Sequence, residues 1–237
     1  MCTLILAHRR WDSCPLFLAS NRDERIKRAS RPPERWASAI NAPVDEEAGG
    51  TWLGYNDQGV VAALTNRYGA LSDLSKRSRG ELVPLVLEAK TAALGAEAIA
   101  SIDLGVYNPF HLLIADTKSA WLVRPLPEGT HLERLSAGYH VFTERSFQSP
   151  PSARESSIYE ALETWPSKEA PQLSHVQKVL AQHATPAFDG HCVHLPELDY
   201  GTRSSSVLSI DAKGLVSWFF ADGAPCEHTL TRINSLG

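Results

Sequence analysis

The chain carries a cysteine directly after its initiator methionine, at the start of the apolar stretch Cys2–His8. A methionine that precedes a small residue is generally removed, which leaves Cys2 with both a thiol and a free α-amine. Because a peptide α-amine has a pKa of about 7.7–8.0, its neutral form can accept the thiol proton near physiological pH. Cys2 is therefore a candidate nucleophile that brings its own base. The alternative is a small, buried strand residue.

Charged and amide side chains follow the next apolar stretch, Leu16–Ser20, as Asn21-Arg22-Asp23. A hairpin of this length returns the chain to its start, so we expect Asp23 to lie beside Cys2. There it can hold the α-amine or the thiol by a charge-assisted hydrogen bond. Arg22 can lower the pKa of the thiol or bind an anionic substrate, and Asn21 is a further substrate-binding candidate. Asn and Asp also end strands simply because they suit turns, and that alternative stays open.

Three further residues are candidates for the same site. Asn66 follows the strand predicted over Val60–Thr65, and its amide is a suitable donor to an oxyanion. Arg203 precedes the strand predicted over Val207–Ile210, either reaching into a pocket or lying solvated in a loop. Trp52 is flanked by glycines and either lines an apolar substrate pocket or packs in the core.

Four apolar hairpins predict antiparallel sheets, because each pairs two short apolar runs across a polar turn. They cover Cys2–His8 with Leu16–Ser20, Thr51–Tyr55 with Val60–Thr65, His111–Ala115 with Ala120–Arg124, and Val207–Ile210 with Leu215–Ala221. Weaker strands are predicted over His131–Ser136, Tyr139–Thr143 and His228–Ile233. Runs without alternation predict strands that are buried on both faces. We therefore expect an α+β fold, a four-layer αββα sandwich of antiparallel sheets.

Helices are predicted between the hairpins. Ser78-Arg79-Gly80-Glu81 resembles a capping box, and helical spacing continues from Leu82 to Ala93. A second helix is predicted over Ala153–Trp165, and a third starts near Ser174 with His183 on its apolar face. The polar segments Arg25–Glu47 and Leu71–Arg79 are predicted to be loops over a site.

Composition limits the functions that this chain can have. Its 237 residues are 43% hydrophobic and 21% charged, with a net charge of −4 and no basic stripe, so we expect no nucleic-acid partner. No apolar run is long enough to span a bilayer, and the first residues lack the pattern of a signal peptide. We expect one domain over residues 1–237, a cytoplasmic location and free thiols.

A metal site is not expected from the sequence. His191-Cys192-Val193-His194 holds a Cys–His pair two residues apart, but no second pair has suitable spacing. The motifs therefore predict no metal and no cofactor, and the expected partner is a small-molecule substrate or ligand.

Five motifs in order resemble the NRDE family, which includes transport and Golgi organisation 2. They are MCTLILAH with LASNRDE, AGGTWLG, ALTNR, SRGELV and YGTRSSSVL, and they run from residue 2 to about residue 210. The resemblance implies the αββα sandwich of N-terminal nucleophile hydrolases. A more distant likeness is to the penicillin V acylase and bile salt hydrolase group, which cleave amides with an N-terminal cysteine.

By this resemblance, Cys2 is nucleophile and base, and Asp23 is the partner of its amine. Asn66 is an oxyanion donor, and Arg203 is the arginine near the nucleophile. The chain departs from the pattern at two positions: Ser20 stands where the acylases carry Arg, and Glu144 stands where NRDE relatives typically carry Asn. An ionised Glu144 cannot donate a hydrogen bond as an amide does.

The resemblance leaves two functions open. The first is an N-terminal-cysteine hydrolase of a non-peptide amide or an acyl thioester. The second is a non-enzymatic binding protein for haem or acyl-CoA on the same scaffold, since members of the family are linked to lipid, acyl-CoA and haem homeostasis.

Overall fold

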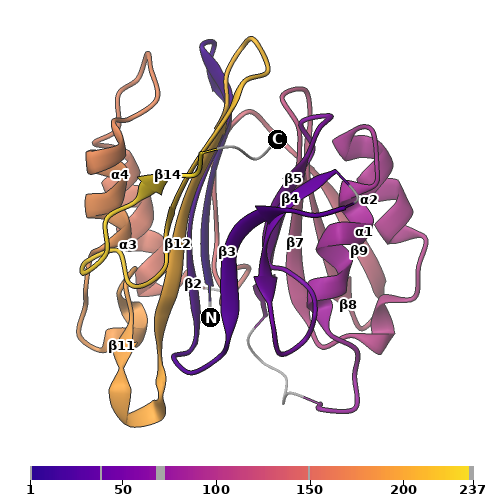
Figure 1. Ribbon diagram of the computed structural model, residues 1–237, viewed down its shortest axis with the longest axis horizontal. Helices are drawn as coiled ribbons and strands as arrows, with labels where there is room; N and C mark the ends of the chain where they lie inside the picture. Colours follow the sequence, from indigo (N-terminus) through magenta and orange to yellow (C-terminus); the bar gives the residue numbers. More distant parts are fainter. Residues whose placement is uncertain (1, 38, 68–72, 149, 235–237) are drawn as a thin grey trace. The chain divides into compact units, whose positions relative to one another are not determined.

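Two compact units make up the chain in the computed structural model, which describes residues 2–37, 39–67, 73–148 and 150–234 (Figure 1). The first unit combines residues 1–28 with 137–234, and the second contains residues 29–136. The segments that join them follow Arg28 and Ser136. The single domain expected from the sequence stays a prediction, and each unit is described by itself.

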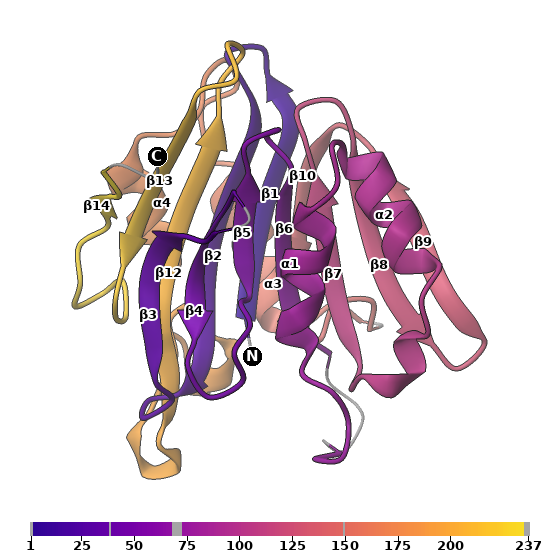
Figure 2. The ribbon, with the colours of Figure 1, turned by 45° about the vertical axis from the view of Figure 1, so that its right-hand side comes forward.

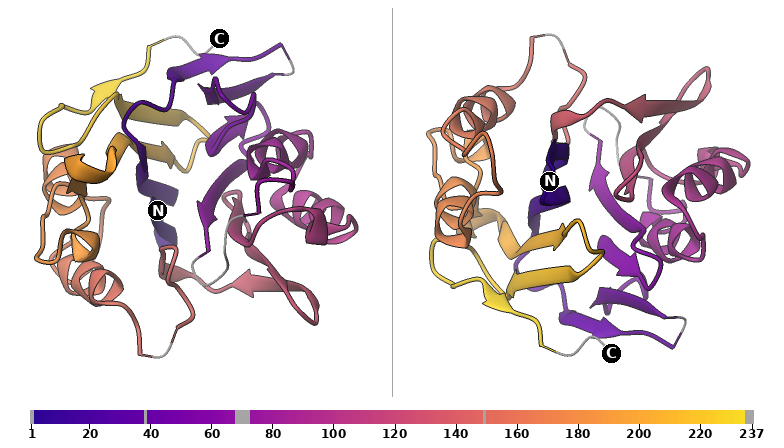
Figure 3. Two further views of the ribbon diagram at one scale, coloured as in Figure 1. Left: turned by 90° about the horizontal axis from the view of Figure 1, so that it is seen from below. Right: turned by 90° about the horizontal axis from the view of Figure 1, so that it is seen from above.

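The first unit is an antiparallel sheet with two helices on one face (Figure 3). The strand order is β10-β1-β2-β12-β13-β14, and β11 pairs with β12. The strands are β1 (Cys2–Trp11), β2 (Cys14–Arg25), β10 (Gly138–Phe142), β11 (His194–Leu195), β12 (Tyr200–Ile210), β13 (Val216–Ala221) and β14 (Thr231–Arg232). Helices α3 (Ala153–Leu162) and α4 (Leu173–Leu180) cover the sheet. Ile158 and Val176 from these helices pack against Ile5 and Ala19 of the two central strands.

The second unit repeats this arrangement with its own sheet, in the order β3-β4-β5-β6-β7-β8-β9 (Figure 2). The strands are β3 (Ser30–Arg35), β4 (Ile40–Asp45), β5 (Leu53–Asn56), β6 (Val61–Asn66), β7 (Phe110–Ala115), β8 (Ala120–Leu126) and β9 (Gly129–Leu135). Helices α1 (Leu82–Leu87) and α2 (Ala92–Ala100) contribute Val86 and Ile99 to a core that includes Leu112. The four predicted hairpins and the antiparallel sheets are confirmed.

The helix predicted from Leu82 to Ala93 is wrong as a single element. Helix α1 ends at Leu87, and α2 begins at Ala92. Thr91 caps α2, because its hydroxyl accepts a hydrogen bond from the Leu94 backbone N–H at 3.3 Å. A side-chain oxygen at this position favours a new helix start over continuation of the first helix.

The loop predicted over Arg25–Glu47 is also wrong, because it contains β3 and β4. The sequence pattern does not predict β3, because it contains Pro32 and Pro33. Proline is tolerated where an edge strand needs no ladder hydrogen bond, and β3 lies at the edge of its sheet with a register shift between Arg31 and Glu34. The other predicted loop, Leu71–Arg79, begins outside the described residues. Its described part ends in the short 3₁₀ helix Arg79–Glu81, which Ser78 caps.

Two glycine-containing motifs, AGGTWLG and SRGELV, contact each other within the second unit. This contact predicts that stability is sensitive to substitution at Gly50. The backbone N–H of Thr51 donates to the Gly80 carbonyl at 3.0 Å, and a Cβ added at Gly50 would lie 2.5 Å from the Gly80 carbonyl carbon. We expect Gly50→Ala to lower the free energy of unfolding by about 1–3 kcal/mol, because the backbone must move apart. Urea unfolding measures this change.

Gly105→Ala is the matched control, because its added Cβ would meet only the Asp103 side chain, 3.0 Å from Oδ1. Equal stability of the two variants would contradict the importance of the contact between Gly50 and Gly80.

Candidate active site

Cys2 opens β1 and pairs in register with Arg22 of β2. Directly paired residues of an antiparallel ladder project from the same face, so the thiol and the guanidinium share one face of the sheet. Burial raises the pKa of the Cys2 thiol, and the Asp23 carboxylate raises it further. The Arg22 charge and a backbone hydrogen bond with Asp23 lower it. Because burial is the largest of these effects, the thiol needs a nearby base to become a nucleophile.

Asp23 follows Arg22 and is completely enclosed. Its Oδ1 accepts a 2.7 Å hydrogen bond from the Thr202 hydroxyl, and its Oδ2 accepts a 3.2 Å hydrogen bond from Arg154 Nη1. The Tyr200 hydroxyl donates to the Asp23 carbonyl at 2.9 Å. Burial raises the pKa of Asp23, while Arg154 and the Thr202 hydrogen bond oppose that rise. The carboxylate is therefore held in place by β12 and α3.

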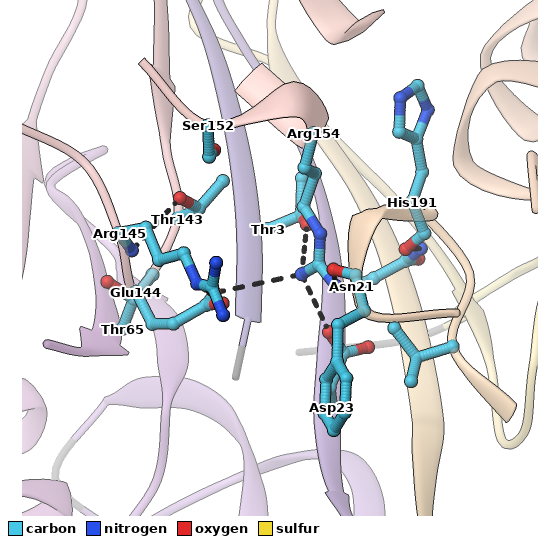
Figure 4. A network of polar contacts seen from close by, with 12 residues as sticks. Thr3, Asn21, Asp23, Thr65, Thr143, Glu144, Arg145, Ser152, Arg154 and His191 are labelled. Atoms are coloured by element: carbon cyan, nitrogen blue, oxygen red, sulfur yellow. Dashed lines mark hydrogen bonds and ion pairs between the residues drawn. The ribbon is translucent and has the colours of Figure 1, made fainter. Parts of the chain in front are cut away.

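Arg154 links the network and is not among the residues that the sequence predicts for the site. It extends from the first turn of α3 and is one of the largest fully buried side chains among the described residues. Figure 4 shows its guanidinium between Asp23 and Glu144. Nη1 also lies 3.5 Å from the Thr3 hydroxyl, and Nη2 donates to the Phe188 carbonyl at 2.6 Å. No local pattern marks this arginine, because only the packing of α3 on the sheet brings it to β2.

Glu144 lies just after β10 and faces two guanidinium groups. Its Oε2 is 3.7 Å from Arg154 Nη1, and its Oε1 is 3.8 Å from Arg145 Nε. Burial raises the pKa of Glu144, and the Arg154 charge opposes this rise. The residue that stands in place of an Asn is thus tied into the same charged network as Asp23.

Asn21 lies on the face of β2 that the helices cover, and its side chain is buried. Its Nδ2 donates to the carbonyls of Leu180 at 2.9 Å and His191 at 2.8 Å, and its Oδ1 accepts a 2.6 Å hydrogen bond from the Ser205 hydroxyl. These contacts favour a positioning role for Asn21 over direct contact with a substrate. Successive strand residues project to opposite faces, so Asp23 shares the helix side with Asn21, and Arg22 lies on the other side.

Arg203 occupies a bulge in β12. The ladder between β2 and β12 shifts here, from the pair Thr202 with Asp23 to the pair Ser204 with Arg22. The Arg203 guanidinium donates to Asp222 Oδ1 at 2.9 Å. In the motif YGTRSSSVL, the residue that contacts Asp23 is Thr202, which directly precedes Arg203. Strand alternation opposite β2 is the signal that could have identified it.

Asn66 and Trp52 belong to the second unit. Asn66 ends β6, is half-buried and pairs with Phe110 of β7; within the described part of the chain, no hydrogen bond engages its side-chain amide. Trp52 is half-buried just before β5, and its carbonyl accepts a 2.9 Å hydrogen bond from the Leu64 backbone N–H. Their assignments as oxyanion donor and pocket residue stay predictions.

Solved structures with the same arrangement of sheets and helices define the class of fold. The *Caenorhabditis elegans* N-acylethanolamine-hydrolyzing acid amidase ortholog matches with a TM-score of 0.62 and 14% identity, covering 90% of this chain and 94% of that chain. Penicillin V acylase from *Agrobacterium tumefaciens* matches with a TM-score of 0.58 and 15% identity, covering 94% and 83%. The fold is therefore that of the N-terminal nucleophile hydrolases, and the predicted αββα class is confirmed.

Within that class, the chain belongs to the transport and Golgi organisation 2 family, whose pattern matches residues 1–221. It is 30% identical to the transport and Golgi organization protein 2 homolog of *Bos taurus* and 29% identical to that of *Homo sapiens*. Each alignment covers 86% of this chain and 84% of the relative. Among the described residues, no helix combines the length and apolarity needed to cross a membrane.

The buried ion pair predicts a large effect of removing Arg154. Arg154→Met leaves the Asp23 carboxylate enclosed without its counter-charge, so we expect a loss of about 3–5 kcal/mol in the free energy of unfolding. Urea unfolding measures this loss. Arg203→Met is the matched control, because its partner Asp222 is exposed, and we expect a change of at most about 1 kcal/mol. Equal effects of the two substitutions would show that the buried pair does not stabilise the unit.

The raised pKa of Glu144 predicts a pH-dependent contribution to stability. Above the ordinary glutamate pKa, the unfolded chain loses this proton before the folded chain does, so the contribution falls as pH rises through the folded-state pKa. Glu144→Gln has no such proton. The stability difference, wild type minus variant, should decrease by up to about 1.4 kcal/mol per pH unit above about pH 4.5. A difference that does not vary with pH, measured by urea unfolding, would refute the shift.

Proposed function

We propose that this protein is an N-terminal-cysteine hydrolase of a non-peptide amide or an acyl thioester. The observation that carries the proposal is the placement of Cys2 at the first position of β1, where it pairs with Arg22. Asp23 directly follows Arg22, and Thr202 and Arg154 hold its carboxylate. The fold supports it, because the similar structures include an acid amidase, a penicillin acylase and a conjugated bile acid hydrolase. At their low sequence identity these neighbours support the scaffold only.

The two faces of β2 suggest a division of roles. The Asp23 carboxylate lies on the side of α3 and α4, whereas Arg22 shares the other side with Cys2. Asp23 is then suited to orient the α-amine of a processed Cys2, and Arg22 is suited to favour the thiolate or to attract an anionic group of the substrate. Arg154 and Thr202 serve as positioning residues for Asp23.

The proposed reaction follows from these roles. The Cys2 sulfur attacks the substrate carbonyl carbon while the neutral α-amine takes the thiol proton. Asn66 is proposed to donate its amide N–H to the oxyanion that forms. Collapse breaks the bond to the leaving amine or thiol, which receives the proton from the α-ammonium group. Water then hydrolyses the Cys2 thioester, so that substrate and water give one carboxylic acid and one amine or thiol.

Trapping of the acyl intermediate tests this function. We expect an acyl-CoA or an activated N-acyl amide, mixed with the mature chain and quenched in acid, to add one acyl group at Cys2. Cys2→Ala should give no adduct, and Cys14→Ala should react like wild type, because buried Cys14 lies at the start of β2. Intact-mass and peptide analysis locate the adduct. Acylation spread over the other cysteines, or adducts of equal yield in Cys2→Ala, would refute the proposal.

The alternative is a binding protein for haem or acyl-CoA on the same scaffold. It predicts that Cys2→Ala keeps full affinity for the ligand and that wild type shows no turnover. Equilibrium binding of haem and of an acyl-CoA to both proteins, measured beside the trapping experiment, distinguishes the two functions.

A further inference from the structure

Two cysteines and two histidines that lie far from Cys2 in the sequence come together in the first unit. His194 opens β11, and Cys192 lies two residues before it. His183 follows α4, and Cys226 lies between β13 and β14. One ligand atom from each of these residues can be chosen so that all four atoms lie within 4.8 Å of one another. The expectation of no metal site rested on spacing along the chain. The fold supplies the second pair from residues that are distant in sequence.

The distances within the cluster are close to those of a tetrahedral metal site. The two sulfurs, of Cys192 and Cys226, lie 3.5 Å apart, and His194 Nε2 lies 3.5 Å from Cys192 Sγ and 3.1 Å from Cys226 Sγ. Zinc–sulfur bonds of about 2.3 Å and zinc–nitrogen bonds of about 2.0–2.1 Å give tetrahedral edges of about 3.8 Å between sulfurs and about 3.6 Å between sulfur and nitrogen. The three distances among Cys192, His194 and Cys226 thus differ from these edges by about half an ångström or less, and a ring nitrogen of His183 lies within 4.8 Å of the other three ligand atoms.

Hydrogen bonds outside the cluster hold its segments together. The backbone N–H of Cys192 donates to the Gln182 carbonyl at 2.9 Å, which places Cys192 beside the residue before His183. The Gln177 side chain of α4 donates to the Pro225 carbonyl at 2.9 Å, next to Cys226. The loop that carries Cys226 is thus docked on the helix that leads to His183.

We propose that His183, Cys192, His194 and Cys226 form a structural zinc site. Two thiolates and two imidazoles in tetrahedral array are a preferred zinc ligand set, and the two thiolate charges balance Zn²⁺. Four protein ligands complete the coordination and leave no open position for a substrate, so the role is structural rather than catalytic. The proposal does not depend on hydrolase activity.

The site would support Asp23 through two intervening residues, Val193 and Thr202. Val193 lies between Cys192 and His194, and its backbone N–H donates to Thr202 Oγ1 at 2.9 Å. The Thr202 hydroxyl in turn donates to Asp23 Oδ1 at 2.7 Å, and the Thr202 N–H donates to the Val193 carbonyl at 2.8 Å. A metal that fixes both neighbours of Val193 therefore restrains the residue that orients the Asp23 carboxylate.

Metal content of the untagged full chain, purified under reducing conditions, tests the proposal. We expect about one zinc per chain in wild type and in Cys14→Ala, and only background zinc in Cys226→Ser. Cys226 is exposed, so this variant is expected to fold, and circular dichroism checks that it does. Co²⁺ added to the metal-free wild-type chain should give the visible and sulfur-to-cobalt absorption bands of a tetrahedral thiolate site. Co²⁺ added to metal-free Cys226→Ser should not give these bands.

Hydrogen exchange supplies a readout of the connection to Asp23. Removal of zinc by a chelator should speed exchange in peptides covering 191–203, while peptides from β7 and β8 keep their rates. Three results would overturn the proposal: a reduced wild-type chain that takes up neither Zn²⁺ nor Co²⁺, equal uptake by Cys226→Ser, or a Cys192–Cys226 disulfide in the reduced preparation. The acylation of Cys2 is a separate measurement, so failure of one proposal is distinguishable from failure of the other.

Discussion

The enclosed carboxylate of Asp23 is the constraint on which the candidate site depends. An ionised carboxylate away from water is strongly unfavourable unless opposite charge and hydrogen bonds compensate it. Here α3 supplies the Arg154 guanidinium, and β12 supplies the Thr202 hydroxyl. Because these partners come from distant parts of the first unit, its helix layer and its sheet must both be in place before the carboxylate is held.

The same constraint explains why polar residues gather inside an otherwise apolar unit. Four polar residues, Thr3, Asn21, Glu144 and His191, are buried near Arg154 or its neighbours, and each makes polar contacts within the network or beside it. Such a network gains little stability over an apolar core of equal volume. Under the proposed function the network has a second role, because an N-terminal nucleophile requires a fixed carboxylate to orient its α-amine.

The sequence predicted the local parts of the fold well. Hairpins with Asx-type turns, such as Asn56 to Gly59, carry their signal in adjacent residues, and the structure confirms them. The β3–β4 hairpin escaped detection because its prolines break the strand pattern. Arg154 and the cluster of Cys192 with Cys226 also escaped detection, since their partners are 131 and 34 residues away. Such contacts arise from tertiary packing, which spacing along one chain does not reveal.

The proposed chemistry requires that the mature protein begins at Cys2, with its α-amine beside Asp23. The most direct test is the intact mass of the untagged protein from cells, followed by sequencing of its N-terminal peptide. We expect a chain that has lost Met1 and starts with an unblocked cysteine. A protein that keeps its methionine, or whose Cys2 amine is blocked, would contradict the account, because the proposed base would then be absent.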